Sequence, residues 1–485
     1  MKNVKILFWF ILILFWGYFS YAQVIKIQNV DEAIKIGLEN NKDLKTKLLD
    51  VMSANANLKG ALADIILPSV NASFKLYTFD PNTLESGISK VTSFQIVTNV
   101  VMGVTNIAMI PKESTVTNVF ADNYSLGVSA SYRVPYLLPF GLDISYNSYL
   151  LQLKNKEIAD LQYQKAVNDY IYNLKIAYYN YLFAKEFAKI SQETDKRLEE
   201  NVRIAEANYA AGIFSDLDLI RAKVQLINNK PNLYSSSNNV RIQKLNLINL
   251  LGLDINEVDN IEILGNIEDI KREFSNVVID FDYYKSVIPS TNPDLAILKR
   301  LIDLSEISKN VSLSANKPTV ALFFNYTYEL KKTNNFENER YWKDSWTAGI
   351  QLNIPISELI PISKSYANME NADYSISKSK QNYETTLNLI NIQIDQIKLK
   401  INENLQNISA QEANVEQAKR SLDIITQRYS YGNASSLDLI DAQLAYQQAE
   451  LNLLSSWVSY VNNILNLYKL SGFFVDGGKK NEREN

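Results

Sequence analysis

Residues 209–222 read YAAGIFSDLDLIRA, and residues 429–442 read YSYGNASSLDLIDA. The two segments lie 220 residues apart and are identical at eight of their fourteen positions. The same register continues without a gap to Gly252 in the first copy and Gly472 in the second. This long ungapped match predicts that two copies of one supersecondary unit organise the chain.

The duplication also sets the expected domain boundaries. Asn41 begins the sequence NKDL, and Asn292 begins NPDL about 250 residues later, so an insertion of about 30 residues lies in the first copy. The expected divisions are a signal peptide (1–22), a first repeat (23–252), a linker (253–281), a second repeat (282–472) and a C-terminal tail (473–485).

Each repeat contains a run that predicts a very long helix. Residues 142–211 and residues 362–431 contain neither Gly nor Pro, which gives seventy residues each and a span of roughly 105 Å if helical. Before each run we expect a helix (30–67 and 282–316) and two strands, and after it a shorter amphipathic helix. Pro231 is expected to kink the first of these shorter helices.

Four segments alternate between apolar and polar side chains, as strands with one apolar face do. They are residues 70–77, 124–134, 320–329 and 346–354. Lengths near ten residues fit transmembrane β-strands, although a soluble antiparallel sheet with one face on a core gives the same alternation. Four strands leave open edges in lipid, so the chain would have to oligomerise. A dimer would supply eight strands and a trimer twelve.

Composition excludes several classes of function. The 485 residues contain no His and no Cys, which excludes Ser–His or Cys–His nucleophiles, zinc sites of the usual kind and disulfides. A net charge of −4 gives no basic field for nucleic acid. No Gly-x-x-x-x-Gly-Lys-Ser/Thr motif appears, so the sequence gives no sign of a nucleotide-hydrolysing P-loop.

The N-terminus is typical of an export signal. Lys2 and Lys5 precede a continuous apolar run at residues 6–19, and Ser20 and Ala22 place small residues where signal peptidase acts. An anchor that stays attached is the alternative, but the run is shorter than the ~20 residues that a spanning helix needs. We therefore expect cleavage after Ala22 and no spanning helix in the mature chain.

The duplication, the paired Asn-x-x-Leu helix starts, the strands and the paired turns together resemble the TolC-like outer membrane efflux proteins, from Val30 to Gly472. The resemblance implies a mainly α protein with membrane β-strands: a homotrimer whose twelve-stranded β-barrel lies in outer membrane lipid and continues as an α-helical periplasmic tunnel. It also implies a mixed equatorial region, built from residues such as 253–285 and the tail. The expected partners are a periplasmic adaptor (membrane fusion) protein and an inner-membrane transporter.

The two duplicated turns contain the residue types that end one helix and begin the next. Gly212 and Gly432 suit the left-handed residue after a helix. Ser215 and Ser435 suit the N-cap of the following helix. Asp218 and Asp438, three residues further on, would complete a capping box with these serines. For Asp218 this structural role is one interpretation, and a contact between the two turns is the other.

Asp441 lies one turn after Asp438 on the same helix face, where the first copy has Arg221. A capping box needs one carboxylate, so Asp441 has no evident structural task. By resemblance to the family, Asp438 and Asp441 would line the periplasmic entrance and favour cations.

By the same resemblance, links between the two turns would hold the entrance closed. These gate contacts would involve Asp218 and Tyr429, with Tyr209 at the matching position of the first turn. The family has an Arg two residues after the second-turn Gly, and this chain has Ala434 there. A different or weaker latch is therefore expected.

The segment from Asp80 to Ala121 separates the first two predicted strands by about 42 residues. Loops of this length are usually functional or disordered. Its apolar stretch from Phe94 to Ile110 allows two interpretations: a disordered or variable surface loop, or an ordered segment that caps the barrel mouth or forms an extra hairpin.

The function expected from the sequence is a passive exit duct for efflux or secretion. The duct would lie in the cell outer membrane, extend into the periplasm, and have no catalytic residues, metal or cofactor. The alternative is a periplasmic coiled-coil scaffold or adaptor without a barrel. Two helical hairpins combined with duplicated amphipathic strand pairs argue against an adaptor, which would carry one hairpin.

Overall fold

The computed structural model describes residues 25–77, 89–101, 104–116, 123–137, 141–142, 144–275, 277–314, 316–332 and 340–474. The expected signal peptide and nearly all of the expected tail lie outside these ranges. The described chain divides into two compact units that cut across both sequence repeats. One unit contains residues 25–53, 157–302 and 378–474, and the other contains residues 54–156 and 303–377.

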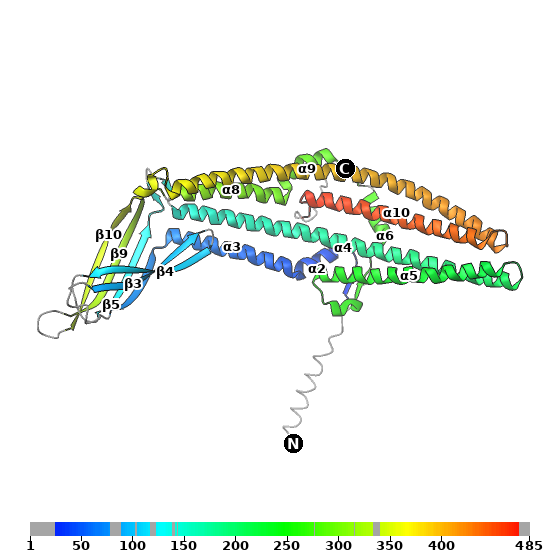
Figure 1. Ribbon diagram of the computed structural model, residues 1–485, viewed down its shortest axis with the longest axis horizontal. Coiled ribbons are helices and arrows are strands. Elements are labelled where there is room, and N and C mark those ends of the chain that lie inside the picture. Colours follow the sequence, from blue (N-terminus) through cyan, green and yellow to red (C-terminus); the bar gives the residue numbers. More distant parts are fainter. Residues whose placement is uncertain are drawn as a thin grey trace, which may run out of the picture. The chain divides into compact units, whose positions relative to one another are not determined.

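The first unit contains the duplicated helical hairpins. The first hairpin joins α4 (Ile144–Ala210) to α5 (Asp216–Leu251), and the second joins α9 (Lys364–Ser430) to α10 (Ser436–Leu470). Figure 1 shows α10 and α5 running alongside the part of α4 that belongs to this unit. All boundaries of the second hairpin except the last match the first at the offset of 220. Helix α5 continues through Pro231 without a break.

Two asparagine residues join short helices end to end. Asn41 lies between α2 (Val30–Asn40) and α3 (Lys42–Ile66), and Asn292 lies between α7 (Phe281–Thr291) and α8 (Pro293–Ser314). The Asn292 side chain accepts a hydrogen bond from the Leu295 N–H at 3.0 Å and donates to the Leu470 carbonyl at 2.8 Å. Each helical stretch predicted over 30–67 and 282–316 is therefore two helices, because the Asn backbone is extended. The second helix of each begins at the predicted Asn-x-x-Leu start.

The core of the first unit lies where small elements pack on the middle of the helices. Strand β1 (Ile25–Ile27) pairs in parallel with β8 (Ile261–Ile263), next to η2 (Ile255–Asn260) and the amphipathic helix α6 (Ile267–Ser275). The buried Tyr179 of α4 meets this region, since its hydroxyl donates to Glu273 of α6 at 3.1 Å.

The second unit contains a four-stranded antiparallel sheet in the order β10-β9-β5-β2. Its strands are β2 (Ser69–Tyr77), β5 (Asn123–Arg133), β9 (Thr319–Lys332) and β10 (Arg340–Asn353). The register aligns the apolar faces of all four strands. The direct cross-strand neighbours Ala72, Val128, Tyr326 and Trp346, for example, form one row.

The insertion in the first repeat forms a hairpin of its own. Strand β3 (Ser89–Val101) pairs antiparallel with β4 (Val104–Val116) in a separate two-stranded sheet. The described part of the segment 80–121 therefore forms an extra hairpin, which was one of its predicted interpretations. Its remaining residues lie outside the described ranges.

Short elements connect the sheet to the long helices. Strands β6 (Tyr136–Leu137) and β7 (Gly141–Leu142) pair before α4, and the 3-10 helix η3 (Ile356–Leu359) precedes α9. A search of the described helices for a segment long and apolar enough to cross a membrane found none.

Candidate functional site

The two hairpin turns of the first unit have the same backbone conformation. Gly212 has φ of +73° and Gly432 has φ of +74°, in the left-handed region that favours glycine. The Gly212 N–H donates to the Tyr209 carbonyl at 3.0 Å, and the Gly432 N–H donates to the Tyr429 carbonyl at 3.0 Å. Each glycine thus lets the long helix end and the chain reverse.

A capping box begins the second helix of each hairpin. In the first turn the Ser215 side chain accepts from the Asp218 N–H at 3.3 Å, and the Asp218 carboxylate accepts from the Ser215 N–H at 3.2 Å. Ser435 and Asp438 repeat this arrangement at 3.1 and 3.0 Å. Each box satisfies N–H groups that a helix start otherwise leaves unpaired.

The two carboxylates of the second turn differ in their surroundings. Hydrogen bonds from the Ser435 side chain and backbone, and the nearby Arg428 guanidinium, lower the pKa of the Asp438 carboxyl. Asp441 is also exposed, and it makes no hydrogen bond or ion pair to any residue that the structure describes. Asp438 therefore has a structural task, and Asp441 is a carboxylate free to meet solutes.

The two turns meet through an aromatic contact. The Tyr429 side chain is fully buried, and its ring centroid lies 4.9 Å from that of Phe214 in the first turn. The Tyr429 hydroxyl lies near Ser436 and Asp218, but within the described residues it has no hydrogen-bond partner of good geometry, and burial raises its pKa. Phe214 and Tyr429 are the aromatic clasp between the turns.

The clasp is one-sided. Tyr209 matches Tyr429 in the duplication, yet its side chain is 46% exposed. The residues of the second turn that match Ile213 and Phe214 are Asn433 and Ala434, and neither provides a ring to cover Tyr209. The structure therefore brings Tyr429 and Asp218 together at the contact between the turns and leaves Tyr209 outside it.

Two residues at these turns did not emerge from the sequence pattern. Phe214 covers Tyr429, and the Arg428 side chain donates to the Asn433 carbonyl at 3.2 Å. The available signal was the asymmetry between the copies, because Phe214 aligns with Ala434 and Arg428 with Asn208. A duplicated pair that differs in size or charge marks a position where the copies have different contacts.

Next to the turns, polar side chains form a layer between α4 and α10. The buried side chains Asn201 and Gln443 share a hydrogen bond of 2.6 Å. One turn further on, the Arg197 guanidinium lies 3.8 Å from the Glu450 carboxylate and 5.2 Å from the Tyr446 ring centroid. These contacts hold the two hairpins in one register close to the turns.

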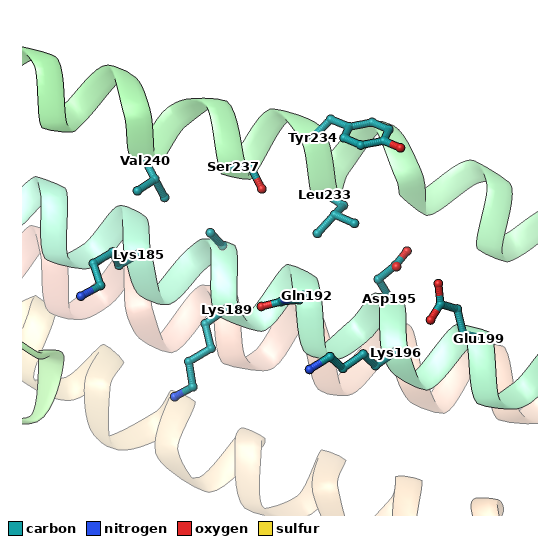
Figure 2. A pocket seen from close by; sticks show the side chains of 11 residues that line it. Lys185, Lys189, Gln192, Asp195, Lys196, Glu199, Leu233, Tyr234, Ser237 and Val240 are labelled. Atoms are coloured by element: carbon teal, nitrogen blue, oxygen red, sulfur yellow. The ribbon is translucent and has the colours of Figure 1, made fainter. Parts of the chain in front are cut away.

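A groove of about 580 Å³ lies between α4 and α5. Figure 2 shows Leu233 and Val240 of α5 facing α4 across it. Asp195 and Glu199 at one end are paired with Lys230, at 2.7 and 3.1 Å. The remaining charged side chains of the lining are Lys185, Lys189 and Lys196. The groove thus offers a positively charged edge beside apolar side chains.

None of the described residues form a cluster of three or more carboxylates that could hold a metal ion. What the turns offer among the described residues is two exposed aspartates, Asp438 and Asp441, on the second turn, and one ring contact that joins it to the first.

A family model described as outer membrane efflux protein matches residues 33–253 and 290–473. No curated protein sequence matches the chain significantly. Together the two matched segments cover most of the chain, including both helical hairpins and all four strands of the sheet.

Solved outer membrane channels have a similar structure. The chain matches CusC, whose crystal structures concern folding and transmembrane channel formation, at a TM-score of 0.70 and 17% identity over 91% of each chain. It matches the CmeC outer membrane channel of Campylobacter jejuni at a TM-score of 0.68 and 18% identity, over 94% of this chain and 87% of that one.

A third similar solved structure is the open state of the MtrE outer membrane channel of Neisseria gonorrhoeae. The TM-score is 0.67 and the identity 16%, over 96% of this chain and 95% of the other. At these identities the likeness shows the fold, and the family model shows the relationship. The chain therefore belongs to the outer membrane efflux protein family, and its place in the cell is the outer membrane.

Proposed function

We propose that three copies of the chain form a passive exit duct for efflux or secretion. Their four-stranded sheets would close one barrel in the outer membrane, and their helical hairpins would enclose a tunnel through the periplasm. The observation that carries this proposal is the apolar face of the sheet, supported by membership of the family.

Large apolar side chains cover one face of the sheet and are exposed in the single chain. Trp346 is 67% exposed and Phe74 is 67% exposed, and the face continues across all four strands. A monomeric soluble protein rarely exposes so large an apolar surface, whereas a lipid-facing surface requires one. The polar face would then line the bore.

The edges of the sheet support oligomerisation. Strands β2 and β10 each have one neighbour in the described sheet. An unpaired edge in hydrocarbon costs several kcal/mol for each unsatisfied backbone group. Pairing β2 of one copy with β10 of the next would satisfy both edges.

An exposed row of apolar side chains on α5, the α5 seam, also supports oligomerisation. Leu217, Ile220, Val224 and Ile227 lie on one face of the helix, and Ile227 is 67% exposed. The spacing of three and four residues is typical of a seam that packs against another helix. A neighbouring copy in the trimer would cover it.

The turns would form the periplasmic entrance. Three copies of Asp438 and Asp441 would place six carboxylates around one axis, which favours the entry of cations. The chain itself would not be an enzyme. An inner-membrane transporter would supply the energy, and a periplasmic adaptor would join it to the turns.

Cell fractionation and electrophoresis test the proposal. We expect the protein in the outer membrane fraction, as a trimer band in SDS gels that dissociates on boiling. Recovery of a soluble monomer from the periplasm would instead support the scaffold or adaptor alternative.

A further inference from the structure

The polar face of the sheet carries one large apolar side chain among those that the structure describes there. Phe323 of β9 lies in a row of cross-strand neighbours with Ser69, Ser131 and Gly349. Rows on either side contain small or polar residues: Arg133, Ala321 and Gln351, and Ser129, Asn325 and Thr347. A phenylalanine here differs from the other side chains that the structure describes on this face.

The Phe323 ring lies over Gly349, its direct partner on β10. A Cβ atom added at Gly349 would lie 2.9 Å from the ring Cζ and 3.0 Å from Cε1. Those distances are shorter than any ordinary contact, so the ring occupies the space that a side chain at position 349 would need. Gly349 thus lets the ring lie along the wall of the sheet instead of standing away from it.

Covering a glycine is a stabilising arrangement between strands in its own right. It does not by itself explain an aromatic ring on the face that would meet water and cargo. Phe324, the next residue, is 43% exposed on the apolar face, where a phenylalanine follows the pattern.

We propose that Phe323 is a contact residue for apolar and aromatic cargo in the bore of the duct, and that Gly349 is its positioning residue. This inference rests on the proposed function, because the polar face is a bore only when several copies close the sheet. Each trimer would then present three such rings at one level. An aromatic face attracts organic cations as well as apolar groups, and the other side chains that the structure describes on this face are small or polar.

Block of single-channel current by tetraphenylphosphonium tests the contact role. We expect the wild-type channel to be blocked, Phe323→Leu to be blocked less, and Phe323→Ala to be blocked least. Phe324→Ala is the matched control on the opposite face and should be blocked like the wild type. Equal block of wild type and Phe323→Ala channels would overturn the assignment.

The positioning role has its own test. Gly349→Ala should lift the ring into the bore and lower the single-channel conductance. Gly127→Ala is the control, because the one tight contact of a Cβ there would be with the Ser73 hydroxyl at 3.0 Å, while the Tyr326 and Ser73 carbonyl oxygens lie at ordinary distances of 3.7 and 3.9 Å. The double variant Gly349→Ala/Phe323→Ala should regain conductance. No recovery in the double variant would contradict the role of Gly349.

The outcomes separate this inference from the function on which it rests. If wild-type protein forms no pore, the proposed function and the bore contact both fail. If wild-type protein forms pores and the Phe323 variants behave like the Phe324 control, only the bore contact fails. Trimer bands in SDS gels show whether each variant has assembled before its currents are compared.

Discussion

Matching residues of the two repeats have different environments at the turns. Tyr429 is buried under Phe214, whereas Tyr209 is 46% exposed because the second turn offers Ala434 in place of a ring. The two turns, which have the same backbone conformation, meet through an aromatic contact that salt does not screen. That this contact serves as the latch of an entrance stays a prediction.

The first prediction concerns this clasp. Phe214→Ala removes the ring against Tyr429 and should cost about 1–3 kcal/mol of local stability, from lost burial and ring contact. Limited proteolysis should then cut the turns faster than in the wild type. Tyr209→Ala is the matched control and should leave the rate unchanged. Equal rates for both variants would contradict the clasp.

The second prediction concerns the charge of Asp438. Because Ser435 hydrogen bonds lower the pKa of Asp438, the folded state favours the carboxylate. The capping box therefore contributes stability at neutral pH and loses it as the pH falls through the lowered pKa. Ser435→Ala should raise that pKa.

Channel recordings can measure this change. In an Asp441→Asn background, Asp438 remains as the only aspartate of the proposed entrance pair. The cation preference of the channel should then disappear at a higher pH when Ser435→Ala is added. Ser215→Ala, the same change in the first turn, is the control. An unshifted pH dependence would argue that Ser435 does not stabilise the Asp438 charge.

The residue types within a turn are enough to predict its backbone conformation. They are not enough to predict which side chains of the other turn it contacts. The Gly-x-x-Ser-x-x-Asp spacing contains both the left-handed residue and the capping box. Phe214 packs on Tyr429 of the other repeat, so no local pattern identifies it. Arg428 bonds within its own turn, to the Asn433 carbonyl, and only the comparison with Asn208 of the first copy points to it. The entrance roles of Asp438 and Asp441 stay predictions until channels are recorded.

At the scale of elements, Asn41 and Asn292 each join two helices within a stretch predicted as helical, at the Asn-x-x-Leu starts that the duplication marks. Both cap the following helix, and both donate to the end of another: the Leu250 carbonyl at 3.5 Å for Asn41, and the Leu470 carbonyl at 2.8 Å for Asn292. These carbonyls belong to the C-terminal ends of α5 and α10. The sequence repeat therefore marks joints between stacked helices.

The third prediction follows from these distances. Asn292→Ala loses a cap and a well-formed hydrogen bond, and should cost about 1–3 kcal/mol. Asn41→Ala loses an equal cap and a longer, weaker bond, and should cost less. Thermal unfolding followed by circular dichroism compares the two. A larger effect at Asn41 would contradict the account of the joints.

The strands and long helices followed from sequence because their periodicity is local. Alternation located β2, β5, β9 and β10, and the absence of Gly and Pro located α4 and α9. The parallel pairing of β1 with β8 was not predicted, because three-residue strands joined across more than 200 residues have no periodic signal. Hairpin β3–β4 stayed one of two interpretations, because its apolar stretch alone did not distinguish a strand pair from a loop.

At the scale of the whole molecule, the chain exposes apolar surfaces that neighbouring copies would cover in the proposed trimer. The fourth prediction concerns the α5 seam. Val224→Asp places a charge where a neighbouring copy would pack, and should weaken the trimer. Asn238→Asp adds the same charge at an exposed polar position of α5 and is the control. Equal trimer yields in unboiled SDS gels would show that the seam is not an interface between copies.

The central claim is that several copies close one conducting path through the outer membrane. Single-channel recording in planar bilayers, with protein from the trimer band, tests it most directly. We predict discrete conductance steps with a preference for cations, and a loss of that preference in Asp438→Asn/Asp441→Asn trimers. Wild-type protein that assembles as a trimer and gives no conductance steps would contradict the account.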